Sequence, residues 1–147
     1  MIPQVRVQAE DFDLACELEG FGTGANTGAT VSFTGRVRDD TGDLQHLEIE
    51  HYPAMCEAAI EAIAQEAVTR WALTDCRVIH RFGAIPVGDQ IMMVATAARH
   101  RKAAFEAAEF LMDYLKSRAP FWKKEVTKSG TSWVEAKDED EAALRRW

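Results

Sequence analysis

Basic residues gather in two short stretches of the chain, residues 99–102 and residues 116–128. The first reads Arg-His-Arg-Lys, and the second sets five cations against one acid: Lys116, Arg118, Lys123, Lys124 and Lys128 against Glu125. A single charge run is usually a solvated face. Two such runs beside aromatic or apolar residues, in a chain of net charge −7, instead favour a pocket for a small anion.

Lys116 and Lys123 are the candidates for chemistry within the second stretch. A lysine amine flanked by aromatic residues and other cations is suited to act as a base, an acid or an imine-forming group. Lys116 has a structural alternative, because a helix C-terminus also favours positive charge. Lys123 follows Trp122 directly and lies beyond Pro120.

Other catalytic patterns are missing from the sequence, which has no nucleophile elbow, HExxH motif or Walker loop. The glycine-rich segment 20–28 precedes a predicted strand, not a helix, and is interpreted as a flexible connection. The histidines lack the spacing of helical metal ligands, and Cys16, Cys56 and Cys76 form no CxxC pair. The cysteines are expected to be small buried hydrophobes, and neither a metal nor a cofactor is predicted.

Length and composition indicate one ordinary globular domain. The chain has 147 residues, 47% hydrophobic and 28% charged. It contains no apolar run near the ~20 residues of a membrane span, and its first residues do not resemble a signal peptide. Cytoplasmic residence is therefore expected, and the acidic average argues against nucleic-acid binding.

Hydrophobic periodicity predicts the elements that must position these residues. Helices are expected at 11–18, 55–71, 101–118 and 138–147, and the third should bury Ala104, Phe105, Ala108, Leu111, Met112 and Leu115. Strands are expected at 5–7, 29–37, 44–52, 75–82, 89–96, 121–126 and 131–135. Segments 29–37 and 44–52 are interpreted as a hairpin, and 83–88 as a turn. The irregular alternation favours an α+β fold.

Helix geometry limits how the two basic stretches can cooperate. Arg101 and Lys116 would lie roughly 22 Å apart on one helix, at ~1.5 Å per residue. They cannot both contact one small ligand from the same chain. If both are functional, a dimer should bring the helix start of one subunit near the helix end of the other.

The chain resembles the large, catalytic subunit of molybdopterin synthase over nearly its whole length. The resemblance rests on GA (28–29), FTGRVR (33–38), LEIEHYPAM (47–55), HRFG (80–83), VGD (87–89), HRKAAF (100–105), MDYLKSRAPFWKKE (112–125) and WV (133–134). It implies an α/β-hammerhead-type single domain over residues 1–147 with an extra small β subdomain. It also implies a homodimer at the centre of a heterotetramer.

The resemblance further implies a sulfurtransferase of molybdenum cofactor biosynthesis. A small ubiquitin-like carrier subunit, ending in a Gly-Gly thiocarboxylate, would supply two sulfurs. The anionic substrate, cyclic pyranopterin monophosphate, would become the dithiolene of molybdopterin. Carried over residue by residue, the catalytic pair would be Lys116 and Lys123. The substrate contacts would be Arg36, Val37, Arg38, His100, Arg101, Lys116, Lys123, Lys124, Glu125 and Lys137.

Two other functions compete with the sulfurtransferase. One is a non-catalytic nucleotide- or RNA-binding module that uses the basic strip 116–128. The net charge of −7 and the absence of aromatic repeats weigh against it. The other is a scaffold that only docks the carrier protein.

Overall fold

The protein is built on two four-stranded sheets, seen in a computed structural model that describes residues 1–135 and 138–147. Sheet A has the order β1-β4-β6-β2, from strands Gln4–Gln8, Asp75–Arg81, Gln90–Ala98 and Ala29–Arg36. Sheet B has the order β5-β3-β7-β8, from strands Gly83–Pro86, Leu44–His51, Phe121–Thr127 and Gly130–Trp133. Only the β1–β4 pair is parallel among the described pairs.

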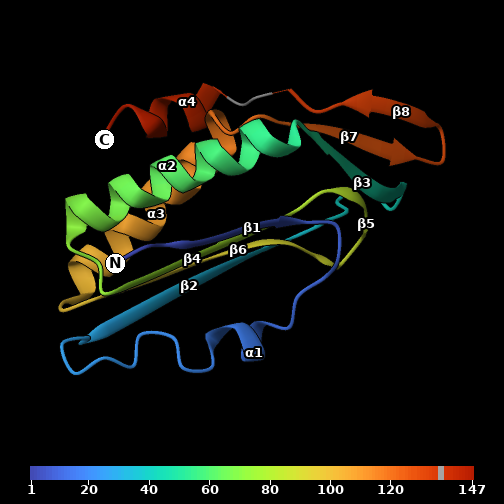
Figure 1. Cartoon of the computed structure of the whole chain (residues 1–147). Helices are drawn as coiled ribbons and strands as arrows, with labels where there is room; N and C mark the ends of the chain where they lie inside the picture. Colours follow the sequence, from blue (N-terminus) through green and yellow to red (C-terminus); the bar gives the residue numbers. More distant parts are fainter. Residues whose placement is uncertain (136–137) are drawn as a thin grey trace.

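Helices cover both faces of sheet A (Figure 1). Helices α2 (Pro53–Trp71), α3 (Arg101–Ser117) and α4 (Asp138–Leu144) lie on one side, and α1 (Leu14–Leu18) lies on the other. The central strand β6 is therefore largely apolar along its whole length, and all its residues from Met92 to Ala98 are buried. Val78 and Val94 pack towards α2 and α3, whereas Ile79 and Met93 pack towards α1. The predicted α+β fold is confirmed.

Helix α3 is the element that matters most for the site. Its buried stripe recurs at helical spacing through Ala104, Ala108, Leu111 and Leu115. The Thr96 hydroxyl of β6 donates a 2.7 Å hydrogen bond to the Ala104 carbonyl and ties the helix to the sheet. The prediction that Phe105 is buried was wrong: its side chain is 57% exposed, because Ala107 and Phe110 fill the interface instead.

Strand pairing differs from the sequence-based prediction. Strands β2 and β3 do not form a hairpin, since β2 pairs with β6 of sheet A while β3 pairs with β5 and β7 of sheet B. Alternation identifies a strand and its buried face, but it does not specify the partner. Residues 83–86, predicted as part of a turn, form β5, where Ile85 is fully buried and Pro86 is tolerated at a sheet edge.

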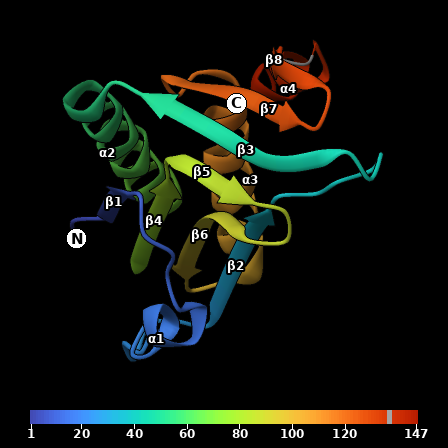
Figure 2. The ribbon, with the colours of Figure 1, turned by 90° about the vertical axis from the view of Figure 1, so that its right-hand side faces the viewer.

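Sheet B packs across one end of sheet A. Figure 2 shows β2 running towards sheet B, with α3 behind the two sheets. The junction is sealed by a cluster of Val37, Leu47, Ile49 and Ile85. The C-terminal end of α3 leads directly into β7, so the second basic stretch lies at this junction. None of the described helices is long and apolar enough to cross a membrane.

Candidate active site

A cavity of about 560 Å³ opens where the two sheets meet the C-terminal end of α3. Its size suits a small organic ligand. Its walls come from segments far apart in the sequence: Phe33, Thr34, Gly35, Arg36, Val37, Arg38, Asp40, Leu44, Leu47, His80, Ile91, Met92, Met112, Leu115, Lys116, Lys123, Glu125 and Val134. Six of the predicted site residues are therefore brought together: Arg36, Val37, Arg38, Lys116, Lys123 and Glu125.

The cavity is cationic in a protein that is acidic on average. Its described lining holds four cations, Arg36, Arg38, Lys116 and Lys123, against the carboxylates of Asp40 and Glu125. Arg36 ends β2 and donates a 2.9 Å hydrogen bond from Nη1 to the Gly88 carbonyl, which fixes its position. Arg38 forms a 3.2 Å ion pair with Asp40 at the solvent edge. This excess of positive charge favours an anion.

The alternation of β7 decides which of its charged residues reach the cavity. Lys123 and Glu125 line it, two residues apart on one face of the strand. Lys124 points to the other face, where its Nζ lies 3.2 Å from Glu50 Oε1 and 4.4 Å from the centroid of the Trp133 ring. Lys124, predicted as a substrate contact, is therefore placed outside the cavity.

The first basic stretch lies at the opposite end of α3. His100 is the N-cap residue of the helix and lines a separate small cavity with Arg99 and residues 25–28, and Arg101 is exposed at the helix start. A Cβ atom at residue 28 would collide with the Arg99 carbonyl oxygen, so Gly28 is required for this close approach. Within one chain these residues do not reach the cavity of Lys116. Lys137 lies outside the described residues.

His80 is a cavity residue to which the sequence assigned no role. It is 2% exposed, its Nδ1–H donates a 2.8 Å hydrogen bond to the Arg81 carbonyl, and its ring stacks on Phe121 at 3.8 Å. Burial lowers its pKa to about 3; the Arg81 carbonyl opposes this shift, and the nearby charges of Lys123, His51 and Lys116 add to it. No spacing rule marks this histidine; only its place in the HRFG motif could have.

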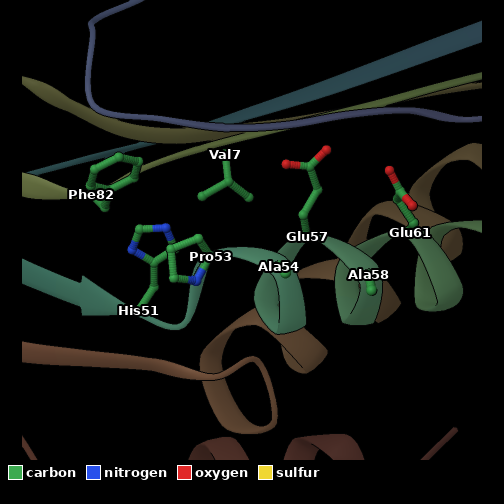
Figure 3. A pocket seen from close by; sticks show the side chains of 8 residues that line it. All are labelled: Val7, His51, Pro53, Ala54, Glu57, Ala58, Glu61 and Phe82. Atoms are coloured by element: carbon green, nitrogen blue, oxygen red, sulfur yellow. The ribbon is translucent and has the colours of Figure 1, made fainter.

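A second cavity, of about 590 Å³, lies between the start of α2 and β1 (Figure 3). The rings of His51 and Phe82 stack at 4.1 Å at one end, and the carboxylates of Glu57 and Glu61 lie along α2. Burial lowers the pKa of His51. This cavity is of similar volume, but no lysine or arginine lines it among the described residues. The junction cavity is therefore the better anion site.

The buried neutral His80 makes stability depend on pH. Its folded pKa is depressed, so the unfolded chain binds the extra proton between about pH 6.5 and about pH 3. The free energy of unfolding should therefore fall on acidification, by about 2 kcal/mol between pH 7 and pH 5. Urea unfolding at a series of pH values measures this slope. His80→Phe should remove most of this pH dependence and leave the smaller contribution of His51. An unchanged slope would contradict the assignment of the pH dependence to His80.

Fold and cavity together define a class: a mixed α+β protein with a cationic cavity at the junction of its two sheets. The model of the MoaE protein family matches residues 7–118. The molybdopterin synthase catalytic subunit of Cereibacter sphaeroides is 62% identical over 145 residues, covering 98% of this chain and 99% of that protein. This chain belongs to the MoaE protein family, as the sequence resemblance predicted.

Solved structures agree with this assignment. The molybdopterin biosynthesis MoaE protein from Burkholderia ambifaria has a TM-score of 0.85 at 48% identity, covering 99% of this chain and 98% of that one. A complex of subunits 1 and 2 of the molybdopterin-converting factor from Helicobacter pylori shares the fold, with a TM-score of 0.74 at 22% identity, covering 91% and 90%.

Proposed function

We propose that this chain is the catalytic subunit of a molybdopterin synthase, working in the cytoplasm. It transfers two sulfurs from the C-terminal thiocarboxylate of a small carrier subunit to cyclic pyranopterin monophosphate and so forms the dithiolene of molybdopterin. The observation that carries this proposal is the cationic junction cavity with Lys116 and Lys123 in its wall. Substrate phosphate and thiocarboxylate are both anions, and charge-assisted hydrogen bonds would hold them.

The cysteines support a route in which sulfur arrives on the partner. Burial raises the pKa of the Cys56 thiol to about 11 and that of the Cys76 thiol to about 12, so neither is a ready nucleophile at neutral pH. Cys16 is exposed, contrary to the prediction that it is buried, but it lies on α1 and does not line the cavity. A persulfide on this chain is therefore not required.

The two lysines are proposed to act on charge and protons. When the thiocarboxylate sulfur bonds to a side-chain carbon of the pterin, the bond from that carbon to its oxygen breaks. The oxygen leaves either as water after protonation or with the freed phosphate group, and the carrier is joined to the substrate as a thioester. Water then cleaves the acyl–sulfur bond, which frees the carrier as a carboxylate and leaves the sulfur on the pterin. The ammonium groups of Lys116 and Lys123 would stabilise the negative charge that develops in both steps.

A homodimer is proposed to complete the site, and strand β2 is its proposed contact. Among the four sheet-edge strands, β5 and β8 have four residues each, and β1 has five with Arg6 at its centre. Short length, proline or charge protects these three edges from pairing with another strand. Strand β2 has eight residues, no charge before Arg36, and Phe33 44% exposed. Such an edge is suited to pair with a second copy.

Antiparallel pairing of β2 with its copy would join the two basic stretches. An eight-residue strand spans about 24 Å, close to the ~22 Å between Arg101 and Lys116 along α3. A two-fold axis near Ser32 and Phe33 would therefore bring the Ala29 end of one β2 beside the Arg36 end of the other. His100 of the partner subunit and Arg101 of the partner subunit would then reach the junction cavity.

Ser32→Lys should convert the dimer to a monomer, because the substitution places two like charges beside the axis and blocks strand pairing. Sedimentation equilibrium measures the mass. The matched control is Ser132→Lys, another exposed serine on an edge strand but in sheet B. A Ser32→Lys protein that stays dimeric would rule out this interface.

The decisive assay mixes the chain with a thiocarboxylated carrier and the cyclic precursor and measures the dithiolene product. Product that depends on both partners supports the proposal. No product, together with tight RNA binding at ~150 mM salt, would favour the nucleic-acid module instead.

A further inference from the structure

The His80 ring has a single tautomer in the folded protein. Its Nδ1 lies 2.8 Å from the Arg81 carbonyl oxygen, an atom that can only accept, so Nδ1 must carry the proton. The other ring nitrogen, Nε2, then presents a lone pair and can only accept. Stacking on Phe121 at 3.8 Å fixes the orientation of the ring.

Nε2 is the polar atom that the His80 ring has left to offer the junction cavity, because Nδ1 is bonded to the Arg81 carbonyl. His80 lines the cavity although only 2% of its surface is exposed, and no donor among the described residues is bonded to Nε2. Among the described residues, the fully buried side-chain atoms without a hydrogen-bond partner are Arg77 Nε and Ser117 Oγ. His80 Nε2 has no partner in the described part of the chain either, but it is not one of these fully buried atoms, so it remains accessible. A nearly buried acceptor that opens to a cavity needs a donor from whatever fills that cavity.

The acceptor stays neutral under working conditions. With a pKa of about 3, His80 is a poor base and does not become a cation near neutral pH. The titratable groups around it are Lys123 on β7, His51 on β3 and Lys116 on α3, and the two lysines are donors. The cavity thus combines cationic donors with one neutral, deeply buried acceptor, which fits a ligand that has an anionic group and an N–H group.

We propose that His80 Nε2 accepts a hydrogen bond from an N–H of the heterocyclic ligand and so helps to select a pterin. This inference rests on the proposed function, because the pterin ring supplies ring N–H and amino donors. The cationic groups would bind the phosphate, and His80 would recognise the ring by accepting this hydrogen bond. A buried acceptor left unpaired discriminates strongly against a ligand that lacks the donor.

The test is calorimetric binding of the cyclic precursor to the chain without carrier, so that no turnover occurs. His80→Phe keeps a ring against Phe121 and removes the acceptor; it should weaken precursor binding about 10- to 100-fold. His80→Gln keeps an acceptor oxygen near the Nε2 position and should remain within about threefold of the wild type. Inorganic phosphate should bind all variants with similar affinity.

His51→Phe is the matched control. His51 belongs to the same group of stacked rings, 6.2 Å from Phe121, but it lines the other cavity. It should leave precursor affinity unchanged. Equal affinity of His80→Phe and wild type would overturn the inference, and so would equal losses in His80→Phe and His80→Gln.

A second measurement needs no substitution. In the wild-type chain, the ¹⁵N resonance of His80 Nε2 should report an unprotonated nitrogen and should move when the precursor binds, but not when inorganic phosphate binds. An Nε2 resonance that does not move when the precursor binds would overturn the inference, even if His80→Phe fails to fold. A wild-type chain that binds neither phosphate nor precursor would instead contradict the proposed function.

Discussion

Lys116→Ala and Lys123→Ala are each expected to lower kcat for dithiolene formation at least about a hundredfold, the usual cost of removing a group that stabilises developing charge. Both side chains line the junction cavity, one from the last turn of α3 and one from β7. The rate of product formation from thiocarboxylated carrier and precursor measures the effect. Carrier affinity should fall far less than kcat, because each substitution removes a single side chain from the cavity wall and leaves the rest of the protein surface unchanged.

Lys128→Ala is the matched control for these variants. Lys128 belongs to the same basic strip but does not line the cavity. Its replacement should leave kcat within about twofold of the wild type, as for most exposed substitutions. If all three lysine variants lose activity equally, the strip acts as a general electrostatic surface. If Lys116→Ala and Lys123→Ala keep full turnover, the proposed catalytic pair is wrong.

Mixing two inactive variants should restore activity if the dimer completes each site. Lys116→Ala and Arg101→Ala homodimers should each be nearly inactive. After subunits exchange at random, about a quarter of all sites should carry both native residues, and activity should return to about a quarter of wild type. The physical reason is that Arg101 and Lys116 lie at opposite ends of α3 and would meet only across the two-fold axis.

The control mixture is Lys116→Ala with Lys123→Ala. These residues line the same cavity within one chain, so no exchange can produce an intact site. Activity should stay at the level of the separate variants. Recovery in this control, or its absence in the Arg101 mixture, would show that the site is not divided between subunits as proposed.

Local patterns predicted the elements well. Helices α2 and α3 could be predicted because their apolar spacing depends only on neighbours in the sequence. Strand partners were not readable. The hairpin assigned to β2 and β3 failed because both strands satisfy the same alternation, and tertiary packing sends them to different sheets.

The candidate site could be predicted only in part, because some of its residues are marked by local patterns and others depend on tertiary packing. Charge clustering and the family motif pointed to Lys116 and Lys123, and the cavity contains both. Neither charge clustering nor the family motif assigned a role to His80, because in the sequence it looks like any isolated core histidine. Its position depends on Phe121, which reaches it through sheet B and not through sequence proximity. Charge clustering also does not reveal that Lys124 lies outside the cavity, because clustering ignores strand alternation.

The pairing of β3 with β7 has a consequence for biosynthesis. Strand β3 emerges from the ribosome early, whereas β7 is made only after α3, and Phe121 pairs with His51 across this gap. Until then β3 can pair only with β5, and the junction cavity lacks the wall that holds Lys123. Such non-local pairing is slow and exposes a strand edge. An unfinished chain is therefore both ligand-incompetent and prone to aggregate, and chaperone protection matters most before β7 appears.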